Sequence, residues 1–274
     1  MVVQHNLQSI NTNRMLGQNV KAVKKSTEKL SSGYAVNRAA DDAAGLSISE
    51  KMRNQIRGIN QAVKNAEDGV SLIQTAEGNM NEIHSILQRM GELATKAAND
   101  PNATEDRKAI KDEMDQLYDE ISAISTKAAF NGTKLLDGTY TGKMLQVGAN
   151  SGENMKISIA SMSANTLLGG KTATTMKVDS HDNASQTMAN ITSAIKNVSD
   201  ARSFLGAVQN RLGYTINNLE NYSENLTSAE SQIRDTNMAT EMTNYTKNNI
   251  LQQAAQAMLS QANQSTQGVL SLLQ

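Results

Sequence analysis

The chain has 274 residues and a formal net charge of −1, from 26 Lys and Arg against 27 Asp and Glu. This balance excludes the strong positive field that attracts nucleic acid or an anionic membrane surface. Cys is absent, which excludes disulfides, thiolate catalysis and Cys-ligated metals. One Pro, no Trp, two Phe and six Tyr leave little material for an aromatic core, whereas the 14 Met suit packing of helix on helix.

Membrane insertion is not expected, because no run of 18 apolar residues occurs in the sequence. The first residues also lack the charged leader and apolar core of a classical signal peptide. If the protein works outside the cell, we expect it to leave by another route.

The first predicted helix lies within residues 1–36 and has a thin apolar seam, meaning a thin line of apolar residues along one face. The seam is interrupted and bordered by Asn, Gln, Ser and Lys, so this helix needs a partner. Its members include Leu7, Ile10, Leu16, Val20 and Val23. Gly33 is a helix stop, and residues 37–45 are predicted to form a connector.

A long helix is predicted over residues 46–98, because apolar residues recur at alternating intervals of four and three. No Pro interrupts it, and at 1.5 Å per residue it would be roughly 80 Å long. Toward its end a second seam takes over, with Ala76, Ile83, Ile86, Met90, Leu93 and Ala97. A turn around Pro101 then predicts a returning antiparallel helix over residues 104–128.

The pattern changes over residues 130–182, where we expect a β-hairpin and a loop. Asn131-Gly132 and Asp137-Gly138 are tight-turn dipeptides, and alternating residues between Lys143 and Ile159 predict the hairpin. The small, polar segment from Ser161 to Asn183 predicts an exposed loop at the far end of the long helix.

Two further helices are predicted, over residues 183–234 and 235–274. The first keeps the three-and-four spacing through six heptads, with polar members that we interpret as register-setting or interface groups. The second has a seam through Leu251, Ala255, Met258, Ala262, Ser265, Val269 and Leu272, and the small residues in this seam let a neighbour approach closely. The thin-seamed helices at the two ends of the chain most economically pair with each other and then with copies of themselves.

Catalytic, cofactor-binding and metal-binding residues are not predicted anywhere. The three His residues lie in separate segments, no H-E-x-x-H motif occurs, and the phosphate-binding and nucleophile-elbow motifs are absent. We therefore expect no cofactor and no enzymatic activity.

Several motifs, in their order along the chain, resemble those of bacterial flagellin. The resemblance covers residues 1–160 and 185–274. The motifs are Leu30–Gly33, Asn37–Leu46, Ser49–Arg53, Gln55–Gly58, Gln74–Gly78, Phe130–Gly132, Lys134–Gly138, Leu205–Leu212, Asn225–Thr227, Ala229–Ser231, Ile233–Asp235 and Gln253–Leu259.

The resemblance to flagellin implies a mainly α fold, a long antiparallel helical bundle or coiled coil with a small β-hairpin region. Residues 1–36 and 235–274 would form a D0 domain that lines the channel of a helical tube, and residues 46–234 a D1 domain in its wall. Outer domains D2 and D3 are not expected, since about two dozen residues separate the hairpin from the next helix.

The resemblance also implies a function: a structural subunit that polymerises into the extracellular bacterial flagellar filament for swimming. Export through the flagellar type III apparatus would explain the missing signal peptide. The implied partners are other copies of the chain, hook-associated junction and cap proteins, and an export chaperone on the C-terminal helix. A hook–filament junction protein is the alternative, and an enzyme with a zinc-protease insert is disfavoured by the short middle segment.

Many flagellins are ligands of Toll-like receptor 5, and the matching receptor-binding residues here would be Gln88, Arg89, Glu92, Leu93 and Glu113. Gly91 departs from the family pattern, which usually has a larger, often basic residue there. A second interpretation is that these residues serve only the packing of subunits.

Overall fold

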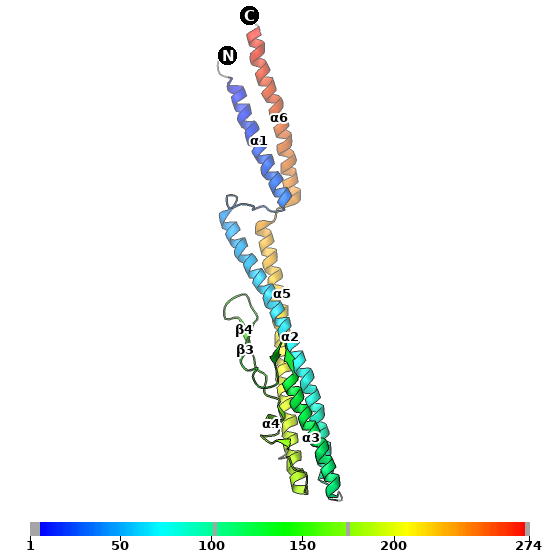
Figure 1. Cartoon of the computed structure of the whole chain (residues 1–274). Coiled ribbons are helices and arrows are strands. Elements are labelled where there is room, and N and C mark those ends of the chain that lie inside the picture. The colour runs from blue at the N-terminus through cyan, green and yellow to red at the C-terminus, as the bar shows by residue number, and fades with distance from the viewer. Residues whose placement is uncertain (1–5, 101–102, 174–175, 272–274) are drawn as a thin grey trace. The chain divides into compact units, whose positions relative to one another are not determined.

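The computed structural model describes residues 6–100, 103–173 and 176–271. The chain forms two compact units (Figure 1). The terminal unit comprises residues 1–55 and 224–274, and the central unit comprises residues 56–223. Helices α2 (Ala43–Ala97) and α5 (His181–Arg234) each contribute to both units.

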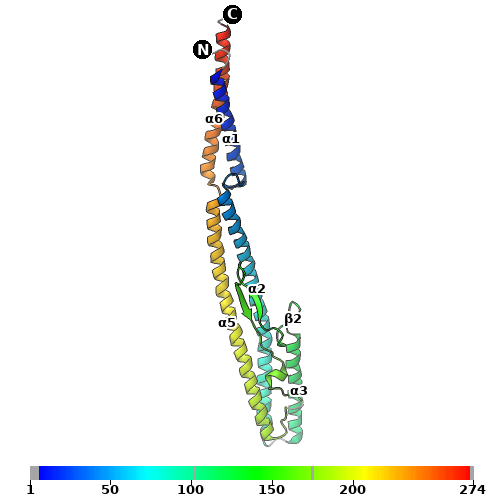
Figure 2. The ribbon, with the colours of Figure 1, turned by 90° about the vertical axis from the view of Figure 1, so that its left-hand side faces the viewer.

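Two helices from opposite ends of the chain lie side by side in the terminal unit, α1 (Leu7–Ser32) and α6 (Met238–Ser271) (Figures 1 and 2). They are antiparallel, since Asn6 at the start of α1 donates to the carbonyl of Ala262 near the end of α6. Asn6 also accepts from the backbone N–H of Ser9 and so caps α1. Gly33 ends α1 at φ 77°, a conformation that favours glycine.

The segments that connect these helices to α2 and α5 pair with each other. Tyr34 and Asp235 form an antiparallel bridge, and Ala35 N–H donates to the Arg234 carbonyl at 2.7 Å. The Arg234 guanidinium stacks over the Tyr34 ring, 4.5 Å from its centre. These contacts fix how the chain leaves α1 and enters α6.

The central unit is built on α2 and α5, with α3 (Thr104–Lys127) packed beside them (Figure 2). Its apolar core draws on α2 residues such as Ile73, Met80, Ile83 and Leu87, all at most 1% exposed. The predicted second seam of α2 is buried apart from Ile86, which is half-buried. The three-and-four spacing therefore predicts the core-facing side of α2.

Polar members of the α5 seam bond to α2, within each unit. In the central unit, Arg202 pairs with Glu77 and Ser223 donates to Asn60. In the terminal unit, the buried Ser49 hydroxyl donates to Glu230 at 2.9 Å. Each of these contacts forms at one alignment of the two helices, and the buried Ser49 hydroxyl has its partner only there, which supports a register-setting role.

Two short antiparallel hairpins follow α3. Strands β1 (Ala129–Phe130) and β2 (Thr133–Lys134) are joined by Asn131 and Gly132, both with positive φ, as the Asn-Gly dipeptide predicts. Strands β3 (Lys143–Gln146) and β4 (Asn154–Ile157) form the second, predicted hairpin. This hairpin packs closely on α2, because a Cβ at Gly58 would lie 2.9 Å from Ala149 Cβ.

The prediction of an exposed loop from Ser161 to Asn183 is wrong. The segment forms the short helix α4 (Ala164–Leu167) and buries apolar side chains in the central core. They are Met162, Ala164, Leu167, Leu168, Met176 and Val178. Isolated apolar residues among small polar ones show no periodicity, so their burial was not visible in the sequence.

The helix predictions are confirmed to within a few residues, and the fold is mainly α with no large outer domain. The long helix begins at Ala43 instead of Leu46, and α5 begins at His181. The division between the two compact units falls inside α2 and α5, at residues 55 and 224, so the predicted D0 and D1 boundaries stay a prediction. Within the described ranges, no helix is both long and apolar enough to span a bilayer.

Candidate functional site

The pair of terminal helices has very little core of its own. Among the described side chains of α1 and α6, only Ser26, Ala255 and Ala262 are buried. All three are small, so the pair removes little apolar area from water. An isolated helix pair with so few buried groups is only marginally stable.

Large apolar side chains of the same pair instead face solvent. On α1, Leu7 is 70% and Ile10 61% exposed, and on α6 Met258 is 62% exposed. Several large exposed apolar side chains along both helices are typical of a surface that another molecule covers. The terminal pair is therefore a candidate assembly surface.

The structure places most of the residues predicted for polymerisation on this surface. Leu7, Ile10, Val20, Leu251 and Met258 are exposed, and Leu16 and Val23 are half-buried. Leu272 and the side chain of Val269 lie outside the described residues.

Sequence reasoning missed four further exposed apolar residues of the pair, Met15, Met238, Met242 and Ile250. They lie beside the predicted seams instead of on them. They could have been found by looking for apolar residues that lie off the predicted seam. A helix that buries only one face does not bury such residues in its own fold.

A second exposed cluster, the Arg89 surface, comprises Gln88, Arg89, Glu92 and Glu113 on α2 and α3. Arg89 donates through Nε and Nη2 to Glu113 Oε1, at 3.1 and 3.0 Å, and through Nη1 to Glu92 Oε2 at 3.0 Å. The carboxylates of Glu113 and Glu92 raise the pKa of Arg89 above its ordinary value. The Arg89–Glu113 pair bridges α2 and α3 at an exposed site, where such pairs contribute little to stability.

Leu93 does not lie on the Arg89 surface, contrary to the prediction that it belongs to the receptor-binding set. Its side chain is 3% exposed and belongs to the central core. The reason is helical geometry: Leu93 follows Met90 and precedes Ala97 on the buried seam of α2, whereas Gln88, Arg89 and Glu92 face outward.

No group of three metal-ligating side chains comes together in the part of the chain that the structure describes. His84 lies 3.1 Å, between the two Nε2 atoms, from Gln88 on the next turn of α2. The two candidate sites in the described residues are therefore surfaces, the terminal helix pair and the Arg89 surface.

Two family models match the chain. The bacterial flagellin N-terminal helical region matches residues 3–141, and the bacterial flagellin C-terminal helical region matches residues 188–273. A flagellin of Halalkalibacterium halodurans is 51% identical over 273 residues, and one of Bacillus subtilis is 48% identical over 305 residues. Both alignments cover 100% of this chain and 100% of the relative.

Solved structures agree with these matches. A Bacillus cereus flagellin aligns with a TM-score of 0.51 and 31% identity, over 57% of this chain and 88% of that chain. A putative flagellar hook-associated protein from Vibrio parahaemolyticus aligns with a TM-score of 0.61 over 71% and 100% of the chains, and at 15% identity it shows a shared fold alone. With two flagellin models spanning most of its length and two flagellins aligned with it from end to end, the chain belongs to the bacterial flagellin family.

Proposed function

We propose that this flagellin is the structural subunit of an extracellular flagellar filament for swimming, and that it polymerises through the terminal helix pair. One observation carries the proposal: α1 and α6 expose Leu7, Ile10, Val20, Leu251 and Met258, whereas only small ones among their described side chains are buried. Covering these apolar groups with other copies of the chain would supply the burial that the pair lacks.

The D0 and D1 assignment follows from the same observation. In this proposal α1 and α6 form D0, the part that is completed by assembly, and the central bundle forms D1. The central unit has its own continuous core, so it needs no neighbour to fold. A division of labour in which one part folds alone and the other folds on assembly suits a subunit that is exported as an unfolded chain through the flagellar type III apparatus.

Other partners follow from family membership. We propose that hook-associated junction and cap proteins bind at the two ends of the filament, and that an export chaperone covers α6 before export. The exposed apolar residues of α6 support the chaperone assignment, because such a helix would aggregate if left bare. The alternative, a hook–filament junction protein, shares this fold but predicts no long homopolymer.

Electron microscopy of the purified chain after salting-out, with filament seeds, tests the proposal. A variant that lacks about thirty N-terminal and forty C-terminal residues is compared under the same conditions. Filaments from the full chain alone are expected. Filaments from the truncated chain would contradict the role of the terminal pair in polymerisation. Failure of the full chain to extend seeds would favour the hook–filament junction protein.

A second candidate function, binding of Toll-like receptor 5, is favoured by the exposure of Gln88, Arg89, Glu92 and Glu113 on one surface. A receptor reporter assay compares Arg89→Ala and Glu113→Ala with Glu120→Ala, an exposed residue elsewhere on α3. A loss of potency of about tenfold is expected for the first two changes only. Unchanged signalling by both would leave packing of subunits as the role of these residues.

A further inference from the structure

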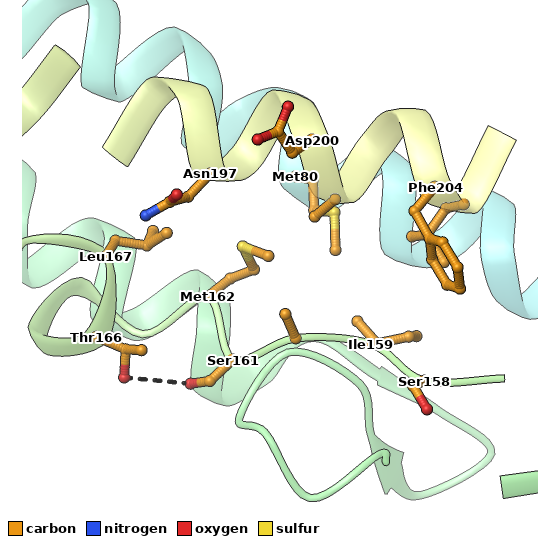
Figure 3. A pocket seen from close by; sticks show the side chains of 13 residues that line it. Met80, Ser158, Ile159, Ser161, Met162, Thr166, Leu167, Asn197, Asp200 and Phe204 are labelled. Atoms are coloured by element: carbon orange, nitrogen blue, oxygen red, sulfur yellow. Dashed lines mark hydrogen bonds between the residues drawn. The ribbon is translucent and has the colours of Figure 1, made fainter. Parts of the chain in front are cut away.

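The central unit has an apolar groove that its own core does not fill. It measures about 420 Å³ and lies between α5, α4 and the segment after β4 (Figure 3). Its floor is made of three buried residues, Met80 from α2 and Ile159 and Met162 from the segment after β4. Because this floor is apolar, the groove suits an apolar side chain better than water.

Two residues of α5 mark the rim of the groove. Phe204 borders it with 51% of its surface exposed, although the whole chain has only two Phe. Asp200, one turn earlier, is the only ionisable residue among the described residues that line it. An exposed aromatic ring beside an apolar hollow, with one carboxylate, is suited to an apolar group accompanied by a positive charge.

The β3–β4 hairpin carries a group with this combination. Met144 on β3 is 64% exposed, and its directly paired residue across the hairpin is Lys156 on β4. Directly paired residues share one face of a two-stranded sheet, so the apolar side chain and the cation are presented together. Since Met144 is exposed, it does not occupy the groove of its own chain.

We propose that Met144 of one copy enters the groove of a second copy, with Lys156 facing Asp200. The proposal rests on the proposed function, in which the chain is a homopolymer, and names a contact of the central unit in it. Groove and hairpin are different surfaces of the same unit, so each copy that donates a hairpin still has a free groove. Such a heterologous contact continues from copy to copy and gives an open helical polymer when its rotation does not close into a ring, whereas a self-complementary contact would close at a dimer.

Disulfide cross-linking tests the contact directly, because the chain contains no Cys. Chains carrying Met144→Cys are mixed with chains carrying Ala160→Cys, a residue that lines the groove, and are polymerised before oxidation. A dimer band is expected in the mixture and in neither variant alone, since a disulfide requires Cα atoms within about 7 Å. Ser151→Cys, at the exposed turn of the same hairpin, is the matched control for Met144→Cys.

The second test exchanges the charges of Asp200 and Lys156. The measured quantity is the lowest protein concentration at which filament seeds are extended. Asp200→Lys and Lys156→Glu are each expected to raise it about tenfold, and the double variant to restore it. Lys143→Glu is the control, because it makes the same charge change at a strand position that is paired with Ile157. Adding Asp200→Lys to it should not restore the seed-extending concentration.

The proposal is overturned if the mixed Cys variants form filaments without the dimer, if Ser151→Cys gives as much dimer, or if Lys143→Glu is rescued as well as Lys156→Glu. Failure of the unsubstituted chain to extend seeds is a different result, since it contradicts the proposed function itself.

Discussion

At the scale of single residues, Leu93 shows how a surface motif can include a residue of the core. It lies on the buried seam of α2, next to exposed residues that carry the Arg89 surface. A substitution there changes folding before it changes any contact with a receptor. Loss of signalling by a Leu93 variant therefore says nothing about receptor contact unless its stability is measured.

Leu93→Ala is expected to destabilise the protein by about 2–5 kcal/mol, because it leaves a cavity in a closely packed core. Gln88→Ala, five residues earlier on the exposed face, should change the free energy of unfolding by less than about 0.5 kcal/mol. Thermal unfolding followed by circular dichroism measures both. Equal effects of the two substitutions would contradict the burial of Leu93.

Asp137 is a second residue whose behaviour follows from its contacts. Its Oδ1 accepts from the hydroxyl of Thr139 at 2.6 Å and from the Thr139 backbone N–H at 2.9 Å. Both hydrogen bonds favour the charged form and hold the pKa of Asp137 below its ordinary value. The stabilisation is therefore complete at pH values above the ordinary carboxyl pKa and is lost as the pH falls through the lowered one.

Thr139→Ala removes the stronger of these hydrogen bonds, so the pKa of Asp137 should rise toward the ordinary value. A pH titration of the Asp137 carboxyl carbon by NMR measures it, with Thr133→Ala in the neighbouring hairpin as the control. The same pKa in both variants would show that the hydroxyl is not the main cause.

At the scale of elements, the glycines of α2 divide into those that the packing requires and those that it does not. A Cβ at Gly91 would touch only Ile191 Cγ2, at an ordinary 3.8 Å. A Cβ at Gly58 would lie 2.9 Å from Ala149 Cβ and 3.3 Å from Ala149 Cα, where the β3–β4 hairpin docks. Of these two glycines, only Gly58 is therefore needed for close approach.

Gly91→Ala is expected to stabilise the protein by about 1 kcal/mol, since alanine has the higher helix propensity. Gly58→Ala should destabilise it by about 1–3 kcal/mol, because the hairpin must move to make room. Urea unfolding of the two variants, side by side, separates these signs. A loss of stability in both would mean that Ile191 cannot accept the added methyl group.

The periodicity of each element decides how much of the fold could be predicted from sequence. Helices α2, α3 and α5 repeat the three-and-four spacing over many turns, so their existence and buried faces were predictable. The seam that contains Met90 and Ala97 also contained Leu93, so its burial was predictable too, although the family motif pointed outward. The fold of residues 161–183 was not, because Met162 and Leu168 are buried by tertiary contacts that leave no local pattern.

The exposed groups were the hardest to predict. Phe204 and Met144 differ from core residues only in lying off a buried seam, and a hydrophobic residue in a helix or strand is assigned to the core by default. The hairpin also places Met144 opposite Lys156, a pairing that depends on strand register. Sequence alone does not show which exposed groups share a surface.

At the scale of the whole molecule, the two units differ in how much of their stability is their own. The central unit has an extended buried core, whereas the described side chains of α1 and α6 bury only Ser26, Ala255 and Ala262. Any process that binds the folded terminal pair stabilises it by mass action. Polymerisation should therefore change the stability of the two units unequally.

Amide hydrogen exchange of the monomer and of the filament tests this. In the monomer, amides of α1 and α6 should exchange far faster than those of α2 at Ile73 to Met90, because local opening of the terminal pair exposes little apolar surface. In the filament, exchange in α1 and α6 should slow by orders of magnitude, while the amides at the centre of α2 change little. Met258→Lys places a charge where neighbouring copies would cover an apolar group. This substitution should therefore prevent both polymerisation and the slowing of exchange in α1 and α6. Slow exchange of α1 and α6 already in the monomer would mean that the pair is stable by itself, and its exposed apolar residues would then need a role other than completing the fold.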